Sequence, residues 1–344
     1  MTDIDTLLRS ARLGPRLAAA TGDERWTAFD ASLIAGGKSN LTFELRSAAG
    51  ELILRRPPAG DLLPSAHDMG REARVQRALA GTDVPVPEIV VFEESSDLLG
   101  VPFYVMDKVP GHVIRDALPA GYAASTGARH QIADALIGVL AELHRVDPQA
   151  VGLSEFGRPQ GFLERQLRRW TGQSEASRTG EVPALDSLGA ALKAQLPTSP
   201  APTIVHGDFR LDNCLMHPTD PSRVAAVLDW ELSTLGDPLT DLGLLLFYWP
   251  EQGEPEIPLV PSVTSQEGFP PRSYLLDRYA ESTGIDVGAV PYYEAFAHFK
   301  FAVIIQGVAA RSAAGTMGGQ NFGNVDDEVI RLAEAGLKIL EVRS

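Results

Sequence analysis

The hydrophobic pattern of this chain is mostly that of strands between about residues 29 and 107 and mostly that of helices from residue 128 onward, and this difference limits the folds that the chain can adopt. In the first of these regions, short alternating stretches are separated by turn-forming segments, which is typical of an antiparallel sheet. The first three stretches are FDASLI (29–34), LTFELRS (41–47) and ELILRR (51–56). From residue 128 onward most apolar residues recur at helical spacing. The sequence therefore predicts an α+β protein with an N-terminal antiparallel sheet and a larger, mainly helical C-terminal part.

One helix and two further strands complete the predicted sheet region. Residues 66–81 have apolar side chains at roughly helical spacing and end at a glycine, so they predict a helix after the third strand. The segments 88–92 and 102–107 predict the last two strands. Ahead of the sheet, residues 3–14 predict a short helix that is followed by a loop. The expected domains are residues 1–107 and residues 108–344.

The second part contains few strand signals. CLMH (214–217) and VAAVLD (224–229) are the two stretches with strand character there. Helices are predicted at residues 130–146, 160–172, 184–196, 291–313 and 325–343.

The composition limits the partners of the chain and its location. The formal net charge is −15, which argues against nucleic acid and anionic membranes as partners, because both bind clustered lysine and arginine. Cys214 is the single cysteine, so no internal disulfide can form, and this fits a reducing compartment. The N-terminal residues lack the features of a secretory signal, and no apolar run is long enough to span a bilayer. We therefore expect a cytoplasmic protein without nucleic-acid or membrane partners.

A glycine-rich turn, GGKSN (36–40), separates the first two predicted strands. It is not a P-loop, because Ser32 stands where that motif needs its first glycine and a strand follows instead of a helix. Glycines at a hairpin still allow the backbone to approach a triphosphate closely and to offer N–H groups to its oxygens. Alone, such a segment can equally be an ordinary turn.

A possible phosphate-binding cation follows on the third predicted strand. ELILRR supplies Arg55 or Arg56, and the next helix supplies Glu72. A cation on the third strand that pairs with a glutamate on the following helix is what kinases use to hold the α- and β-phosphates. Considered alone, these residues can also be solvated surface charges.

The segment HGDFRLDN (206–213) has the most informative spacing in the chain. On a tight loop, Asp208 and Asn213 can face one cleft, with the acid directed toward an incoming hydroxyl and the amide oxygen toward a metal ion. Further on, Asp229 ends an apolar strand, where a carboxylate can hold Mg²⁺ that bridges two phosphates. Asp208 alone can be a turn residue. The ordered set of loop, cation, glutamate, aspartate–asparagine pair and strand-end aspartate favours phosphoryl transfer.

These motifs resemble those of the aminoglycoside phosphotransferase group, whose fold is similar to that of protein kinases. The resemblance covers the chain from about residue 25 and implies a bilobal, protein-kinase-like fold. Within the group, the sequence of these motifs most resembles that of the kinase-type domains of acyl-CoA dehydrogenase family members ten and eleven. The segments that carry the resemblance to the group are GGKSNLTF (36–43), LILRRPP (52–58), HGDFRLDN (206–213) and LDWELSTLGDPLTDLG (228–243). Those that carry the closer resemblance within it are LRRPPAGDLLPSAHD (54–68) and VLDWELSTLGDP (227–238).

The resemblance implies an enzyme that moves the γ-phosphoryl group of ATP, with Mg²⁺, to a hydroxyl group of a small molecule. It implies Asp208 as the catalytic base, Asn213 and Asp229 as magnesium ligands, and Glu72 as the partner of the third-strand cation. The nucleotide contacts that it implies are Gly36, Gly37, Ser39, Asn40 and Arg55, with the Asp107 carbonyl and the Val109 amide at the adenine edge.

The sequence departs from related proteins at two places. Most relatives carry lysine at the position of Arg55, and arginine keeps the charge but has a longer, planar head group. Trp230 and Glu231 stand where protein kinases have phenylalanine and glycine after the metal-binding aspartate, so we expect no comparable flipping switch.

Several polar residues have local explanations. Asp237, which precedes a proline, is expected to cap a helix, and the resemblance implies that Asp241 braces the catalytic loop. His206 is expected to hold that loop by hydrogen bonds, because no second histidine or cysteine lies at metal-ligand spacing. Cys214 is expected to be a small buried apolar residue without a catalytic role.

Two features of the sequence point to different acceptors. Residues 229–344 carry 17 acidic and 7 basic residues, a balance of −10, which would suit a polycationic aminoglycoside. The resemblance of the motifs to the acyl-CoA dehydrogenase family members instead implies a hydroxyacyl-CoA as the acceptor. A third reading is a nucleotide-binding module without catalysis. On the helix at 291–313, Lys300, Gln306 and Arg311 are either surface residues or able to reach the cleft.

Overall fold

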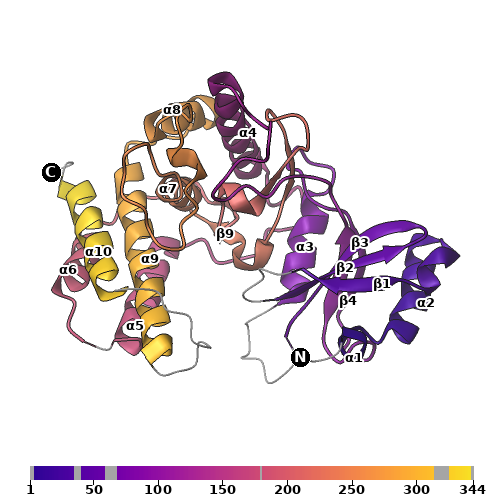
Figure 1. Ribbon diagram of the computed structural model, residues 1–344. Helices are drawn as coiled ribbons and strands as arrows, with labels where there is room; N and C mark the ends of the chain where they lie inside the picture. Colours follow the sequence, from indigo (N-terminus) through magenta and orange to yellow (C-terminus); the bar gives the residue numbers. More distant parts are fainter. Residues whose placement is uncertain (1–3, 35–39, 59–67, 179, 314–324, 342–344) are drawn as a thin grey trace. The chain divides into compact units, whose positions relative to one another are not determined.

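The computed structural model describes residues 4–34, 40–58, 68–178, 180–313 and 325–341 (Figure 1). The chain forms two compact units. The first comprises Met1–Gly111 with Ala225–Ser233, and the second comprises His112–Val224 with Thr234–Ser344. The domain boundary expected between residues 107 and 108 stays a prediction. The hydrophobic pattern does not indicate that residues 225–233 belong to the first unit.

A five-stranded antiparallel sheet forms the centre of the first unit, with the strand order β1-β2-β3-β5-β4. The predicted antiparallel sheet is therefore confirmed, and each strand lies within the stretch expected for it or one residue beyond it. The strands are β1 (Asp30–Leu33), β2 (Leu41–Ser47), β3 (Gly50–Arg56), β4 (Ile89–Glu93) and β5 (Phe103–Asp107), and the helices are α1 (Ile4–Leu8), α2 (Ser10–Thr21) and α3 (Met69–Leu79).

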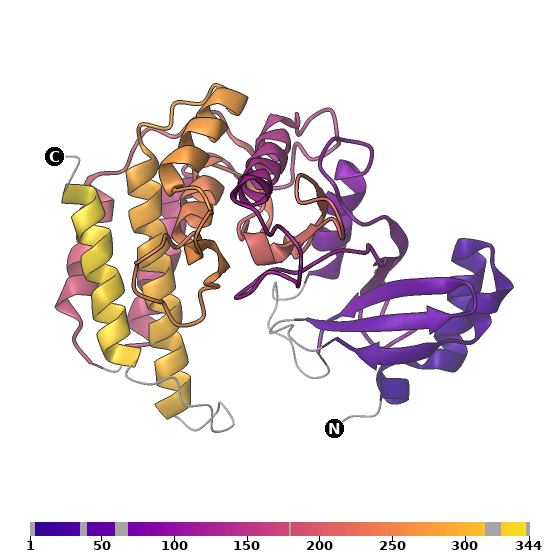
Figure 2. The same ribbon diagram turned by 45° about the horizontal axis from the view of Figure 1, so that its top comes forward.

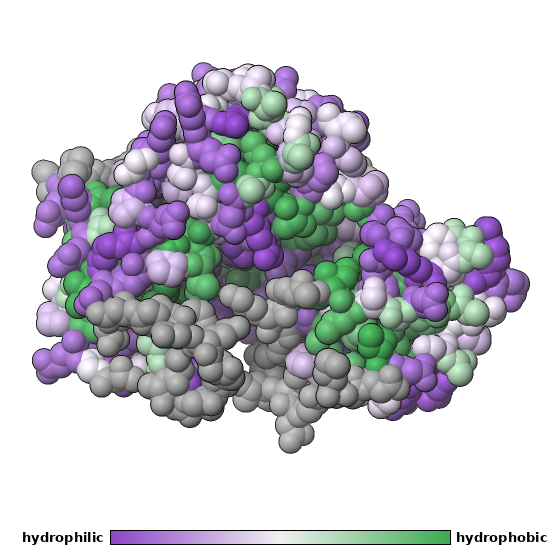
Figure 3. Space-filling view, in the orientation of Figure 1, coloured by the Kyte–Doolittle hydropathy of each residue, from purple (hydrophilic) through white to green (hydrophobic). Residues whose placement is uncertain are grey.

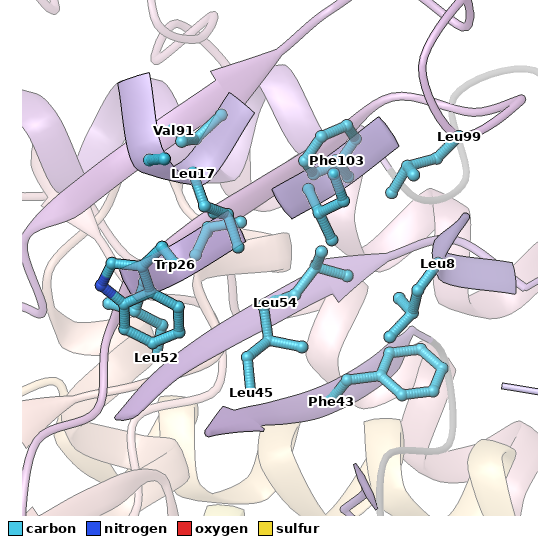
Figure 4. Packing of buried hydrophobic residues seen from close by; sticks show 13 residues of the cluster. Leu8, Leu17, Trp26, Phe43, Leu45, Leu52, Leu54, Val91, Leu99 and Phe103 are labelled. Carbon is cyan, nitrogen blue, oxygen red and sulfur yellow. The ribbon is translucent and has the colours of Figure 1, made fainter. Parts of the chain in front are cut away.

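One face of the sheet carries the apolar core that α1 and α2 cover. Side chains alternate along a strand, so Leu45 of β2 and Leu52 and Leu54 of β3 point to the same face. They are buried there together with Leu17 of α2 and Trp26 (Figure 4). The alternation that identified the strands in the sequence is the pattern that builds this core.

Helix α2 continues through Gly14 and Pro15 to Thr21, so the loop predicted after residue 14 was wrong. A Cβ atom at Gly14 would lie 2.3 Å from the main-chain oxygen of Thr27. Glycine is required at this close approach and does not end the helix. Tertiary packing thus overrides the low helix propensity of the Gly-Pro pair.

The other face of the sheet packs against α3. Ile53 of β3 and Tyr104 and Met106 of β5 form a second buried cluster with Met69 and Ala73 of this helix. Residue 55 follows residue 53 by one alternation, so its side chain also points to the α3 face. The sheet and α3 therefore bring the predicted cation and the predicted glutamate together.

Helices dominate the second unit, and α9 lies at its centre. Helices α5, α6, α7 and α10 pack against α9, and α10 runs beside it in both ribbon views (Figures 1 and 2). On the face that Figure 3 shows, most of the coloured surface of this unit is hydrophilic, with smaller hydrophobic areas. None of the helices in the described ranges is long and apolar enough to cross a membrane. The helices are α4 (Thr126–Arg145), α5 (Phe162–Ala176), α6 (Pro183–Ala194), α7 (Leu239–Phe247), α8 (Arg272–Thr283), α9 (Val290–Ala313) and α10 (Val325–Glu341).

Short strands complete the second unit, and some of its elements were not predicted. Strands β6 (Thr203–Val205) and β9 (Thr234–Gly236) pair in antiparallel fashion. The sequence analysis did not predict β6, β9 or α8, and of α7 it predicted only the start, through the capping role of Asp237. Helix α7 is buried along most of its length, so it lacks the polar face whose spacing reveals a helix in a sequence. The remaining short strands are β7 (Cys214–Met216) and β8 (Val224–Val227).

Candidate active site

Two adjacent arginines on β3 point to opposite faces of the sheet. The Arg55 guanidinium donates to Asp229 at 3.0 Å (Nη2 to Oδ1) and lies 3.4 Å from Glu72 (Nε to Oε2). Arg56 is directed to the other face, where it donates to the main-chain oxygen of Leu7. The structure thus distinguishes a candidate site cation, Arg55, from a structural one.

Glu72 of α3 is fully buried and has three polar partners in the first unit. Asn40 Nδ2 donates to its Oε1 at 3.0 Å, and the Tyr104 hydroxyl donates to its Oε2 at 2.8 Å. Burial raises the pKa of Glu72, and the positive charge of Arg55 opposes this rise. The sequence analysis missed Tyr104, which faces Arg55 across the β3–β5 pair and could have been found once that pairing was known.

Arg55 remains a cation in this environment. Burial alone would lower its pKa, but the neighbouring Tyr104, Glu72 and Asp229 raise the pKa of Arg55 above its ordinary value. Its Nε atom lies at ion-pair distance from Glu72 but has no hydrogen-bond partner among the described residues. The pairing of Arg55 with Glu72 is therefore electrostatic, whereas its pairing with Asp229 includes a hydrogen bond.

Asp229 follows β8 and adopts a left-handed backbone conformation with φ of 64° and ψ of 62°. Residues other than glycine rarely adopt this conformation, and it persists where the surroundings enforce it, often at ligand sites. The surrounding contacts are Trp230 Nε1 to the Val227 oxygen at 3.0 Å and Arg71 Nη2 to the Ser233 oxygen at 2.9 Å. In the described part of the chain, Asp229 Oδ2 accepts no hydrogen bond.

The segment between β6 and β7 brings Asp208 and Asn213 together, as their spacing predicted. Asn213 Nδ2 donates to the main-chain oxygen of Asp208 at 2.8 Å and to its Oδ2 at 2.9 Å. Arg210 Nε donates to the same Oδ2 at 3.2 Å. Asp208 Oδ1 has no hydrogen-bond partner within the described ranges, so it is free to accept a proton from a hydroxyl group.

Asp241, in the first turn of α7, fixes the main chain just before Asp208. It accepts hydrogen bonds from the His206 amide at 2.6 Å and from the Gly207 amide at 2.8 Å. Burial opposes ionisation of this carboxyl, but hydrogen bonding to His144 and the charge of that residue keep the pKa of Asp241 below its usual value. The Asp208 amide in turn donates to His206 Nδ1 at 3.2 Å. These contacts confirm the supporting roles expected for Asp241 and His206.

Basic side chains lie close to the Asp208 loop in the second unit. Arg210 pairs with Asp208 at 3.2 Å and with Asp212 at 3.0 Å. Burial would lower the pKa of Arg210, but these two acids raise it above its ordinary value. Arg115 lies 3.6 Å from Asp212, and Lys300 of α9 donates to the Gly207 oxygen at 3.2 Å. The sequence analysis missed Arg210, although it stands two residues after Asp208 in the same motif.

Other predicted nucleotide contacts lie at the end of the sheet or outside the described ranges. Asp107 is the last residue of β5, and its amide donates to the Glu88 oxygen at 3.0 Å. Val109 follows two residues later. The predicted residues outside the described ranges are Gly36, Gly37 and Ser39.

The remaining expectations concern residues of the second unit. Asp237 accepts from the Leu239 amide at 3.0 Å, so it caps the start of α7 as expected. Gln306 accepts from Ser174 of α5 at 3.0 Å and belongs to the helix packing. Cys214 is buried, as expected.

Comparison with known proteins defines the family. Residues 30–259 match the model of the phosphotransferase enzyme family. The chain belongs to this family. It is 38% identical over 307 residues to acyl-CoA dehydrogenase family member 10 of Mus musculus. The matched region covers 86% of this chain and 28% of that protein. The chain is 36% identical over 329 residues to family member 11 of Homo sapiens, with coverage of 92% and 41%. The chain thus spans less than half the length of each of these two proteins.

Solved structures place this family member among kinase-like folds. A putative aminoglycoside phosphotransferase from Ralstonia eutropha is 34% identical, with a TM-score of 0.80 over 99% of this chain and 98% of that one. An aminoglycoside phosphotransferase solved with GDP and kanamycin is 16% identical, with a TM-score of 0.62 and coverage of 95% and 99%. The α+β, protein-kinase-like fold predicted from the sequence is confirmed.

Proposed function

We propose that this phosphotransferase moves the γ-phosphoryl group of ATP, with Mg²⁺, to a hydroxyl group of an acidic small molecule, and that a hydroxyacyl-CoA is such an acceptor. The observation that carries the proposal is the arrangement of the Asp208 loop. Its peptide groups are held by Asp241 and His206, and one oxygen of Asp208 is bonded while the other is left free. This arrangement suits a general base, which must be fixed in position and still able to accept a proton.

In this proposal each unit supplies different chemistry. Arg55, held by Glu72, would bind the phosphates of the nucleotide, as cations on the third strand do in kinases. Asp208 would accept the proton of the acceptor hydroxyl. The hydroxyl oxygen would attack the γ-phosphorus, and the bond between the γ-phosphorus and the oxygen that bridges it to the β-phosphate would break, which releases ADP. The nucleotide contacts of Asn40, Asp107 and Val109 stay part of the proposal. Asn40 would act through Glu72, to which its side chain is bonded.

The residues proposed as metal ligands suit Mg²⁺, which prefers hard oxygen donors. Asn213 uses its amide nitrogen to bond Asp208, which leaves its amide oxygen as the available ligand atom. Asp229 is bonded through Oδ1, and its second oxygen is likewise available. A bound Mg²⁺ neutralises negative charge on the phosphates. We therefore propose Asn213 and Asp229 as its protein ligands.

The charges near the base favour an acidic acceptor over a polycationic one. Arg115, Arg210 and Lys300 lie around the Asp208 loop and offset the charges of Asp208, Asp212 and Asp241, so the loop is not the strongly acidic surface that would attract an aminoglycoside. The acidic surplus after residue 229 includes acids with local roles, such as Asp241, which binds the main chain of the Asp208 loop, and Glu254, which pairs with Arg272. The similarity to acyl-CoA dehydrogenase family members also supports a thioester acceptor over an aminoglycoside.

Turnover of candidate acceptors tests the proposal. Purified protein with Mg-ATP should phosphorylate hydroxyacyl-CoA thioesters with a kcat/KM at least about tenfold above that for any aminoglycoside, a gap of roughly 1.4 kcal/mol in transition-state binding. The likeness to the Ralstonia eutropha structure favours an aminoglycoside as the second candidate. Equal or faster turnover of kanamycin-like compounds would establish that candidate. Mg-ATP binding without turnover of any acceptor would instead favour a non-catalytic module.

A further inference from the structure

Lys300 stands in an unusual place for a lysine. It lies near the middle of α9, and the adjacent Phe299 and Phe301 are buried in the second unit. Lysine is rarely found among buried side chains unless its charge is paired, because desolvation of an ammonium group is costly. Burial lowers the pKa of Lys300, and the negative charges of Asp208 and Asp241 oppose this effect. Its position therefore calls for an explanation in terms of its partners.

The partners of Lys300 lie on two segments that are distant in sequence. Its Nζ atom donates to the main-chain oxygen of Gly207 at 3.2 Å. It also lies 5.6 Å from the centre of the Trp170 ring on α5, within the range of a cation–π interaction. Lys300 thus connects α5 and α9 to the residue that precedes the proposed base.

The Gly207 oxygen belongs to the peptide group that links Gly207 to Asp208. The N–H of this same peptide group donates to His206 Nδ1 at 3.2 Å. Gly207 has a φ of 83°, a region that glycine enters freely, so its backbone alone does little to fix the orientation of this peptide group. Lys300 and His206 hold the two ends of the group, and a rotation of it would change the direction of the Asp208 side chain.

We propose that Lys300 is a positioning residue, which fixes the peptide group of the base by binding the Gly207 oxygen. This inference rests on the proposed function, in which Asp208 is the base. Because a displacement of about 1 Å at a reacting group can cost on the order of 10²-fold in rate, one main-chain hydrogen bond at this point can control turnover. Mg-ATP binding, which is assigned to Arg55 and Asp229 as well as to Asn213, should depend on it much less than turnover does.

The test compares Lys300→Met with the parent protein and with Lys193→Met, a matched change at an exposed lysine of α6. Lys300→Met should lower kcat by roughly 10- to 100-fold. The Kd for Mg-ATP, measured by calorimetry, should stay within about twofold of the parent value. Lys300→Gln, which keeps a neutral donor, should recover part of the lost kcat. Amide hydrogen exchange across residues 206–213 should become at least about tenfold faster in Lys300→Met, without a matching change in α4.

Several results would overturn the inference. A Lys300→Met protein with parental kcat and parental exchange of the 206–213 segment would do so. A uniform rise in exchange through the second unit, or an equal loss of kcat in Lys300→Gln and Lys300→Met, would show a general packing role instead. If the parent protein turns over no acceptor, the proposed function fails. The exchange measurement then decides the positional role alone, because it needs no substrate.

Discussion

At the residue scale, the proposed chemistry depends on a few polar side chains whose neighbours determine what they can do. Asp208 has one carboxylate oxygen bonded by Asn213 and Arg210 and one without a partner among the described residues. Arg55 is largely buried, and the groups around it, Glu72 and Asp229 among them, raise its pKa against the effect of burial. Each of these properties comes from contacts, so each can be changed by one substitution.

Asp208→Asn should lower kcat by roughly 10²–10⁴, because general-base catalysis contributes about that much. The Kd for Mg-ATP should remain within a few-fold of the parent value, since the amide keeps the size and the polarity of the side chain. Steady-state kinetics and calorimetry measure the two quantities. Asp277→Asn, at an exposed acid of α8, is the matched control and should retain parental turnover. Near-parental kcat in Asp208→Asn would remove Asp208 from the mechanism.

Arg55→Met should destabilise the protein by about 3–5 kcal/mol, because it leaves the buried carboxylate of Glu72 without its cation. Arg55→Lys keeps the charge and should lose less. Burial raises the pKa of Glu72, so the loss in Arg55→Met should shrink as the pH falls and Glu72 becomes protonated. Urea unfolding at several pH values measures this. A loss of the same size in Arg168→Met, at an exposed arginine of α5, would show that the effect is not specific to Glu72.

At the element scale, glycines inside helices have two different roles in this chain. Gly14 of α2 is required by packing, because a Cβ there would meet the Thr27 main chain at 2.3 Å. Gly138 of α4 has no such neighbour, since nothing lies within 4 Å of the corresponding position. The sequence suggests a different distinction: it predicted that a helix ends at Gly14, which Pro15 follows, and that another helix continues through Gly138.

Gly14→Ala and Gly138→Ala should therefore change stability in opposite directions. Gly14→Ala should destabilise by about 1–3 kcal/mol, the usual cost of forcing a backbone shift in a packed region. Gly138→Ala should stabilise by roughly 0.5–1 kcal/mol, because alanine has the higher helix propensity. Chemical unfolding of the two variants beside the parent measures both changes. A stabilised Gly14→Ala protein would contradict the packing explanation for this glycine.

At the scale of the whole molecule, stability depends on buried ionisable groups that have no role in the proposed chemistry. His298 of α9 is one of them. Its Nδ1 lies 2.9 Å from the Glu294 oxygen, and its ring lies edge-on to Phe247 at 4.8 Å. Burial lowers the pKa of His298 from 6.5 to about 4. The folded protein therefore binds this proton less readily than the unfolded chain does.

The sign of the resulting pH dependence follows from this lowered pKa. The contribution of His298 is fully present above pH 6.5 and is lost as the pH falls toward about 4. Over this interval the loss should reach about 3 kcal/mol, at roughly 1.4 kcal/mol per pKa unit. His298→Gln should lack this part of the pH dependence, while His217→Gln should keep it. Unfolding free energies measured from pH 7 to pH 4 test the assignment, and parallel curves for His298→Gln and the parent would refute it.

The sequence by itself determined where the strands of the sheet lie along the chain, the helical character of the second part and the motifs that surround Asp208 and Asp229. These are local properties, because the periods of strands and helices and the spacing of a loop motif are fixed by neighbouring residues. The family resemblance added the roles of Asp208, Asn213 and Asp229, which stay proposals.

Tertiary structure alone decided which residues accompany those motifs. Strand periodicity does not distinguish Arg55 from Arg56 as the partner of Glu72; the family resemblance implied Arg55, and the packing of α3 on one face of the sheet gives the physical reason. Tyr104 joins Glu72 only through the pairing of β3 with β5. Lys300 reaches Gly207 from 93 residues away. The physical reason is the same in each case: these contacts depend on how distant elements pack, and local hydrophobic periodicity carries no information about that.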